Sequence, residues 1–288
     1  MFDGPVKRPD ILARIAAHPL GDTPEAMRAA FRALVLGDDP RAGCDGVRIE
    51  DTGTGLRVRP QGDPEEAEGG PEVIWFHGGG YVFGSPETHL RPAAHLARTH
   101  GMRVTLPRYR LAPEHPWPAA FEDALAAVEG RTLPILAGDS AGGHLALVTA
   151  LELSRQGRPA AGLMLFSPNT DRTGRSETRA AMSAEDPMVD DAGDRRLAQM
   201  CFGDTDPSDP RVSPVLDDLR LLPPTWIEVG EPEVLLDDTR MLWRRGNEVG
   251  AIIGAEVTDG LLHMGQLWAP WWPAACDSLD RAARAMLD

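Results

Sequence analysis

The sequence predicts an α/β fold with a mostly parallel, twisted sheet and helices on both of its faces. The chain has 288 residues, which suits one large domain. Short apolar segments bounded by glycine or proline alternate with longer helix-like segments along most of it. That alternation is typical of parallel strands joined by crossover helices. Hydrophobic residues make up 42% and charged residues 25%, which excludes disorder throughout.

The first part of the chain is predicted to form two short helices. The segment Pro9–Leu36 is interrupted at His18–Gly21. Thr23 followed by Pro24 is a helix start signal, because a capping hydroxyl precedes proline at the first helical position. The second helix has one apolar face, made of Ala26, Met27, Ala30, Phe31, Leu34 and Val35.

The sheet is predicted to begin with a hairpin. Its strands are Val47–Glu50 and Leu56–Arg59, joined by a turn with two glycines. The polar segment Gln61–Pro71 is rich in proline and glycine and is predicted to be a surface loop.

Six strands and five helices are then predicted in alternation. The strands are Val73–Phe76, Met102–Leu106, Leu133–Ala137, Leu163–Phe166, Thr225–Val229 and Ile252–Val257. The helices are Pro92–Thr99, Ala119–Glu129, Ala141–Gln156, Val234–Val249 and Pro273–Leu287. The segment Asn169–Pro224 is too long for an ordinary loop and has a helical piece near Asp191–Phe202. We expect it to be an insertion over the carboxyl end of the sheet.

Charge and cysteine content exclude several classes of partner. The net charge is 29 − 44 = −15, which disfavours binding to nucleic acid and to anionic membranes. No run of 18 apolar residues occurs, and residues 1–20 lack the apolar core of a signal peptide. Cys44, Cys201 and Cys276 have no metal-ligand spacing, so free thiols and no metal site are expected. A cytoplasmic location is expected.

A nucleophile elbow is predicted at Gly138-Asp139-Ser140-Ala141-Gly142. The motif lies between a predicted strand and a predicted helix, which is the context that the Gly-x-Ser-x-Gly pattern requires. The sharp turn exposes the serine hydroxyl, and the glycines leave room for it. The start of the following helix places positive partial charge beside a developing oxyanion.

A second glycine-rich motif, His77-Gly78-Gly79-Gly80-Tyr81, follows the predicted strand Val73–Phe76. Unobstructed backbone N–H groups are the donors that a tetrahedral oxyanion needs. Gly79 and Gly80, with Ala141 after the nucleophile, are therefore predicted to form an oxyanion hole. His77 is expected to hold the loop in shape.

With these motifs the chain resembles the hormone-sensitive-lipase-like carboxylesterases, the bacterial family IV esterases. The resemblance covers about residues 70–270 and includes Tyr109–Ala120, Leu222–Asp238 and the surroundings of His263. It implies an α/β-hydrolase fold with residues 46–288 as the catalytic domain. Residues 1–45 and 170–215 are then expected to form a small helical cap.

The resemblance also implies an activity. We expect a serine hydrolase that cleaves short- to medium-chain acyl esters through an acyl-enzyme, as a monomer or homodimer without cofactor. Its partner is a small-molecule ester. Tyr81 and Asp139, which belong to the two motifs, are predicted to contact substrate. A lactonase or an amidase with the same residues is the alternative within the class, and a non-catalytic small-molecule receptor is the alternative outside it.

The order serine, acid, histidine of this fold selects the remaining catalytic candidates. His263, in a loop after the last predicted strand, is the candidate base, whereas His144 is expected to pack against the sheet or neighbouring loops. Glu233 aligns with the position of the acid, where the family usually has aspartate. Asp237 and Glu231 remain rivals, although Asp237 is expected to cap a helix or pair with an arginine.

Two further segments have structural interpretations. Arg110 and Glu114 are expected to form ion pairs that fix a loop beneath the active site. The aromatic segment Trp268–Trp272 is expected either to line the pocket or to anchor the N-terminal helices.

Overall fold

The computed structural model describes residues 2, 4–63 and 70–288, so most of the predicted loop Gln61–Pro71 lies outside the described residues. The described strands form one sheet. They are β1 (Val47–Asp51), β2 (Gly55–Pro60), β3 (Glu72–Phe76), β4 (Arg103–Pro107), β5 (Ile135–Asp139), β6 (Gly162–Phe166), β7 (Thr225–Gly230) and β8 (Ile252–Thr258). Their order is β1-β2-β4-β3-β5-β6-β7-β8. The β1–β2 and β2–β4 pairs are antiparallel, and the other pairs are parallel.

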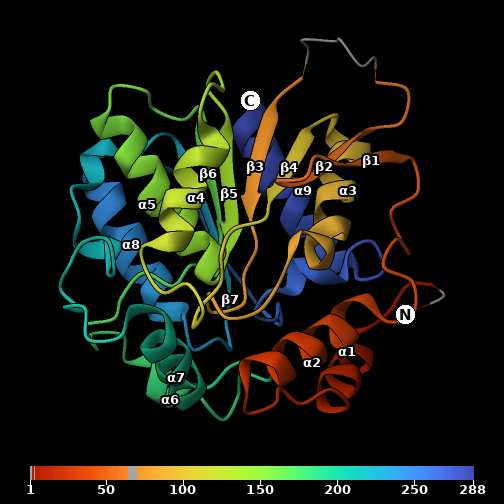
Figure 1. Cartoon of the computed structure of the whole chain (residues 1–288), viewed down its shortest axis with the longest axis horizontal. Coiled ribbons are helices and arrows are strands. Elements are labelled where there is room, and N and C mark those ends of the chain that lie inside the picture. Colours follow the sequence, from red (N-terminus) through yellow and green to blue (C-terminus); the bar gives the residue numbers. More distant parts are fainter. Residues whose placement is uncertain (1, 3, 64–69) are drawn as a thin grey trace.

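Helices cover both faces of this sheet. They are α1 (Arg8–Ala16), α2 (Pro24–Leu36), α3 (Leu90–His100), α4 (Ala119–Val128), α5 (Ala141–Arg155), α6 (Thr178–Ala181), α7 (Asp191–Phe202), α8 (Leu236–Glu248) and α9 (Pro273–Leu287). Figure 1 shows α3 and α9 on one side of the sheet and α4, α5 and α8 on the other. The predicted fold class is confirmed.

The strand that carries the elbow begins later than predicted. Leu133 has a φ of 45° and is exposed, and β5 begins at Ile135. Pro134 lies between them and has no N–H with which to extend a ladder of hydrogen bonds. The prediction that the strand starts at Leu133 is therefore wrong, and β5 instead continues through Gly138 to Asp139, directly before the serine.

Four helices lie beyond the carboxyl ends of the parallel strands. Figure 1 shows α1 and α2 side by side there, with α6 and α7 next to them. Arg28 ties α2 to the core, because its guanidinium donates to the carbonyls of Val82 and Ala112 and to both carboxylate oxygens of Glu114. Residues of α1, α2 and α7 line one cavity together with Ser140, which follows β5, and His263, which follows β8.

The Trp268–Trp272 segment holds the N-terminus. Phe2 makes edge contacts with Trp268 and Trp271, and the N–H of Val6 donates to the carbonyl of Trp271 at 2.9 Å. Arg91 lies over the Trp271 ring at 4.7 Å. Of the two expectations for this segment, the geometry therefore supports anchoring.

The cysteine side chains and the hydropathy of the helices can be compared with the predictions from the sequence. Cys44 and Cys201 are buried free thiols, and Cys276 is a partly buried one, as expected. Among the described residues, none of the helices has the length and apolar character needed to cross a bilayer.

Candidate active site

Ser140 occupies a strained turn between β5 and α5. Its backbone has φ 55° and ψ −121°, a conformation that a non-glycine residue adopts only where its surroundings enforce it. Two glycines make the turn possible. A Cβ on Gly138 would lie 2.2 Å from the carbonyl oxygen of Gly142, and one on Gly142 would lie 2.1 Å from that of Phe76. The predicted elbow is present, and its hydroxyl points to the carboxyl edge of the sheet.

The structure brings Ser140, His263 and Glu233 into one hydrogen-bonded relay. His263 Nε2 lies 3.0 Å from Ser140 Oγ, and His263 Nδ1 lies 2.9 Å from Glu233 Oε2. The backbone N–H of Gly230 donates to the other oxygen of Glu233 at 2.6 Å. Exposed fractions are 9% for Ser140, 3% for His263 and 0% for Glu233, so these bonds are largely shielded from bulk water.

Neither rival acid reaches the histidine. Asp237 accepts a hydrogen bond from the N–H of Thr178 and pairs with Arg240 at 3.4 Å, in agreement with its expected pairing. Glu231 is exposed at the surface. Glu233 is the candidate that lies against His263.

The surroundings of His263 favour its charged form. Burial lowers the pKa of His263, but the hydrogen bond to Glu233, the charge of Glu233 and the charges of Asp186 and Asp139 raise it more, to about 9. An imidazolium formed at this position is therefore well stabilised, which is the property needed of a base that takes a proton from serine.

The glycine loop turns its backbone toward the serine. Gly79 has a φ of 119°, and a Cβ there would lie 2.3 Å from the carbonyl oxygen of Phe83, so only glycine fits. Gly79 and Gly80 both line the cavity that contains Ser140. Within the described residues, no hydrogen bond uses the N–H of Gly79 or of Gly80. Ala141 is the first residue of α5, so its N–H has no partner inside the helix.

His77 and His144 both have structural surroundings. His77 stacks on Tyr109 with ring centroids 4.1 Å apart, and its Nδ1 lies 2.9 Å from the carbonyl of Gly78. Burial lowers the pKa of His77 to about 3, so it is neutral and holds the loop as predicted. His144 contacts the hydroxyl of Tyr81 and the ring of Phe202, in keeping with the packing role expected of it.

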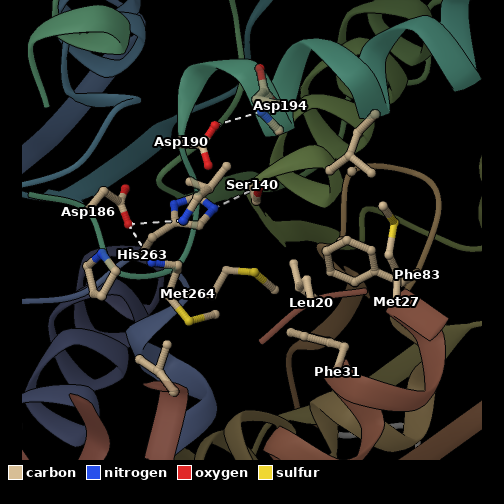
Figure 2. Close-up of a pocket in the computed structure, with 18 of the residues that line it drawn as sticks. Leu20, Met27, Phe31, Phe83, Ser140, Asp186, Asp190, Asp194, His263 and Met264 are labelled. Carbon is tan, nitrogen blue, oxygen red and sulfur yellow. Dashed lines mark hydrogen bonds between the residues drawn. The ribbon is translucent and has the colours of Figure 1, made fainter. Parts of the chain in front are cut away.

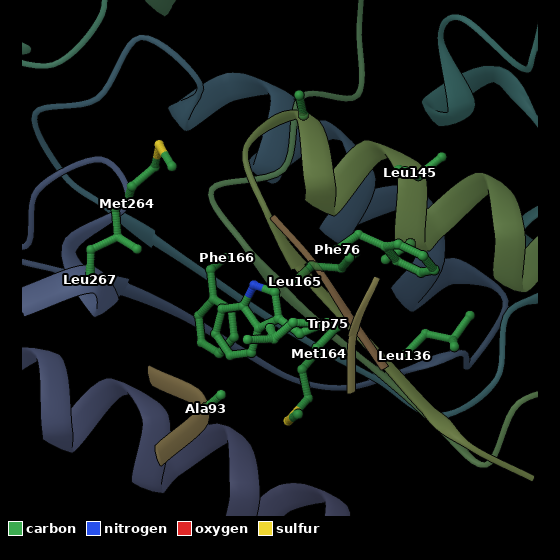
Figure 3. Close-up of a cluster of buried hydrophobic side chains, with 14 of the residues drawn as sticks. Trp75, Phe76, Ala93, Leu136, Leu145, Met164, Leu165, Phe166, Met264 and Leu267 are labelled. Atoms are coloured by element: carbon green, nitrogen blue, oxygen red, sulfur yellow. The ribbon is translucent and has the colours of Figure 1, made fainter. Parts of the chain in front are cut away.

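Tyr81 and Asp139 do not line the cavity, although the sequence analysis predicted that they contact substrate. Asp139 is buried and accepts a hydrogen bond from Trp75 Nε1 at 2.8 Å, with His89 Nε2 3.0 Å away. Figure 3 shows Trp75 stacked on Phe166 in the core that supports this end of β5. The Asp139 carboxylate is directed into these buried contacts and not into the pocket. The geometry gives direct substrate contact no support.

The cavity beside Ser140 has a volume of about 420 Å³ and is mainly apolar. Figure 2 shows the hydrogen bond between Ser140 and His263, with Leu20, Met27, Phe31 and Phe83 gathered across the cavity. Other apolar side chains come from α1, α2 and the segment before and within α7: Ile15, Leu34, Met188 and Leu197. Both expected cap segments, 1–45 and 170–215, therefore contribute to its wall.

Asp186 is a site residue that the sequence analysis missed. It is buried, lines the cavity and lies close to Glu233 and His263. It belongs to the long insertion, where the chain has no regular alternation from which side-chain directions follow. Its position just before Pro187 is a turn signal, but it gives no indication of chemistry.

Two groups in the described part of the chain bring potential metal ligands together. Asp186, Glu233 and His263 offer atoms within 4.8 Å of one another, as do the side chains His95, His100 and Asp280. In the first group, however, His263 is engaged with Ser140 and Glu233 on its two nitrogens. In the second, both histidines lie 2.7 Å from one carboxylate oxygen of Asp280. In both groups, direct hydrogen bonds thus engage the atoms that would bind a metal, although His95 Nδ1 has no partner among the described residues.

The segment Tyr109–Ala120 after β4 is fixed by ion pairs, as expected. Arg110 pairs with Glu122 and Asp123 at 3.0 and 2.9 Å, and Glu114 pairs with Arg28 at 2.6 Å. Since Arg28 lies on α2, the second pair connects this loop to the N-terminal helices.

Known proteins share this architecture. Residues 73–266 match the protein family described as alpha/beta hydrolase fold. The crystal structure of an esterase from the bacterial hormone-sensitive lipase family has a TM-score of 0.85 and 30% identity, covering 97% of this chain and 96% of that chain. The chain belongs to this family of α/β-hydrolases. As a hormone-sensitive-lipase-like hydrolase, it is an enzyme of the carboxylesterase class.

Curated relatives of this hydrolase have esterase names. An acetyl-hydrolase of Streptomyces hygroscopicus is 35% identical over 223 residues, which are 74% of this chain and 74% of the relative. Esterase LipI of Mycobacterium tuberculosis is 30% identical over 282 residues, 93% of this chain and 85% of the relative. A hormone-sensitive lipase from a metagenome library has a TM-score of 0.87 at 30% identity, covering 99% and 98% of the two chains.

Proposed function

We propose that this chain hydrolyses carboxylic esters of short- to medium-chain acids through a covalent acyl-enzyme on Ser140. The observation that carries the proposal is the relay in which His263 lies 3.0 Å from Ser140 and 2.9 Å from Glu233. A serine hydroxyl is a weak nucleophile, and a neutral imidazole within hydrogen-bond distance is what activates it.

Acylation begins when His263 Nε2 takes the hydroxyl proton as Ser140 Oγ attacks the ester carbonyl. The carbonyl oxygen becomes an oxyanion, and the N–H groups of Gly79, Gly80 and Ala141 stabilise it. Glu233 stabilises the imidazolium. When the tetrahedral intermediate collapses, the C–O bond to the alcohol breaks and His263 returns the proton to the departing oxygen.

Deacylation repeats the sequence with water. His263 takes a proton from the water as its oxygen attacks the acyl carbon, and a second oxyanion forms in the same place. Collapse breaks the bond to Ser140 Oγ, which receives the proton from His263. The products are a carboxylic acid and an alcohol, and the enzyme returns to its starting state.

The cavity supports the preference for short and medium acyl chains, of about two to eight carbons. Its volume of about 420 Å³ lies toward the low end of small-molecule pockets. We propose that residues 1–45 and 170–215 act as a cap, because helices from both contribute apolar side chains to the wall. The same relay opens lactones and amides, so lactones belong in the substrate panel.

The test combines covalent labelling with a substrate series. The wild-type protein is expected to be labelled by an organophosphate at Ser140 and to cleave nitrophenyl butyrate faster than the palmitate ester. Ser140→Ala is expected to stay folded, to resist labelling and to lose about 10⁶ in turnover. Near-normal turnover in purified Ser140→Ala would overturn the mechanism, and faster cleavage of palmitate would overturn the chain-length proposal.

A further inference from the structure

A buried carboxylate that the triad chemistry does not use lies next to the relay. Asp186 is 7% exposed and lines the cavity. One of its oxygens accepts hydrogen bonds from the N–H groups of Met188 and Val189, at 2.9 and 3.3 Å. The other accepts from the N–H of Val234 at 3.1 Å. This side chain therefore joins two segments that are distant in the sequence.

The two segments are the pocket wall and the loop of the acid. Met188 contributes to the cavity, whereas Val234 directly follows Glu233. An oxygen of Asp186, an oxygen of Glu233 and a ring nitrogen of His263 all lie within 4.8 Å of one another. Asp186 is thus close enough to act on the relay both through the backbone and through its charge.

We propose that Asp186 is a positioning residue for ester hydrolysis, which fastens the pocket wall to the loop of Glu233 and places a second negative charge beside His263. The inference rests on the proposed roles of Ser140, Glu233 and His263. It adds a fourth side chain that sets the orientation of the acid and the proton affinity of the base.

The charges around this carboxylate support the assignment. Burial raises the pKa of Asp186 to about 6, with His263 lowering it and Glu233 raising it. Between that pH and the pKa of His263, about 9, Asp186 is an anion that faces an imidazolium. The charged groups that act on His263 are Glu233, Asp186 and Asp139, and all three favour the imidazolium. Removing one of these charges must therefore lower the proton affinity of His263.

The decisive variant is Asp186→Asn, which removes the charge and keeps the shape of the side chain. Asp186→Ser is a second neutral variant with an oxygen acceptor, in case the first does not fold. The matched control is Asp237→Asn. Asp237 also accepts a backbone hydrogen bond that links the insertion to α8, from Thr178 at 3.2 Å, but it is not among the groups that act on His263.

Two measurements distinguish positioning from simple structural support. The pKa of His263 is followed by NMR titration, and the pH profile of kcat/KM is recorded with a nitrophenyl ester. In Asp186→Asn or Asp186→Ser, both the pKa and the acid limb of the profile are expected to move down by about one pH unit, since an opposite charge within 4–6 Å is worth at least that much. The Asp237→Asn control is expected to leave both unchanged.

Different measurements test the role of Asp186 and the proposed ester hydrolysis. If the Asp186 variants lose stability while the pKa of His263 and the acid limb stay at their wild-type values, Asp186 is a structural acceptor and the inference is overturned. Organophosphate labelling of Ser140 in the wild type tests the proposed function independently. The NMR titration needs no turnover, so it gives a result on Asp186 in either case.

Discussion

Glu233 reaches His263 from a loop in which both carboxylate oxygens are engaged. One oxygen accepts from the N–H of Gly230 at 2.6 Å and the other from His263 at 2.9 Å. The hydrogen bond from Gly230 orients the Glu233 side chain independently of His263, so the acid is held by its own loop. A glutamate here is one C–C bond longer than the aspartate usual in this family, and the loop accommodates the extra length.

The first prediction concerns the charge of this acid. Glu233→Gln is expected to fold but to lose about 10⁴ in turnover, because the imidazolium loses its stabilising carboxylate and the histidine its orientation. Glu233→Asp is expected to retain part of the activity, since it keeps the charge and withdraws it by about 1.5 Å. Steady-state kinetics and a thermal melt of each purified variant check both points.

Asp237→Asn is the control for this prediction. It is expected to reduce stability by about 1 kcal/mol, as the loss of a helix-end contact does, with turnover nearly intact. Loss of turnover in folded Asp237→Asn combined with activity in Glu233→Gln would assign the acid to Asp237 instead.

The site was predictable wherever a motif fixes the backbone. Ser140, Gly79 and Gly80 belong to turns whose conformations need these residue types, so the sequence indicates where their atoms point. Tyr81 and Asp139 adjoin the same turns, but proximity in sequence does not determine side-chain direction, and both face inward. Asp186 comes from an irregular segment and meets Val234 through a contact 48 residues apart in the chain.

At the scale of elements, α2 shapes the pocket with its apolar face. The face predicted from helical spacing includes Met27, Phe31 and Leu34, and all three line the cavity. Phe31 also packs on Phe83, with ring centroids 5.0 Å apart. The helical periodicity predicts that this face of α2 is shielded from solvent. Whether the face packs against the core or lines a substrate pocket depends on tertiary packing, which the sequence alone does not specify.

The second prediction tests this wall. Phe31→Leu is expected to raise the ratio of kcat/KM for octanoate over butyrate esters several-fold, because a smaller side chain leaves room for more methylene groups, each worth about 1 kcal/mol or more in an apolar pocket. Phe121→Leu is the matched control. Phe121 lies on α4, stacks on Trp117 and is not among the cavity residues, so its substitution is expected to leave the ratio unchanged.

Equal ratios in Phe31→Leu and the wild type would contradict a role for α2 in chain-length selection. Both variants lose a similar amount of buried surface, so a general loosening of the fold would alter both ratios alike. Only a change confined to Phe31→Leu identifies the wall of the pocket as the cause.

Most element boundaries lie within two residues of the predicted ones, because most strands of this fold are short apolar runs. α9 has the predicted bounds, Pro273–Leu287, with proline at its first position. The short helix α6 was not predicted, since four residues are too few for a periodic pattern. Local patterns thus determine the layers of the core, and the insertion depends on contacts between distant segments.

For the whole molecule, buried neutral histidines link stability to pH. His77 and His144 are both completely buried, and burial is the main reason that the pKa of each is lowered from 6.5 to about 3. His89 lowers the pKa of His77 further, and Arg172 that of His144. In the unfolded chain both rings bind a proton below pH 6.5, whereas in the folded protein they do not until about pH 3.

The last prediction follows from this difference. Because the unfolded state binds more protons in this window, the free energy of unfolding falls as the pH drops from 6.5 toward 3, by about 1.4 kcal/mol per pH unit for each histidine. Asp186 opposes part of this fall between pH 3.8 and about 6, because its raised pKa makes the folded state bind more protons there. Two histidines change the number of bound protons more than one carboxyl does, so the free energy of unfolding still falls as the pH drops.

Urea unfolding at several pH values tests this. In His144→Gln, the free energy of unfolding is expected to change with pH less steeply than in the wild type, by about one proton. His115→Gln, which alters an exposed ring, should reproduce the wild-type slope. Parallel curves for His144→Gln and the wild type would mean that His144 is not held neutral in the folded protein.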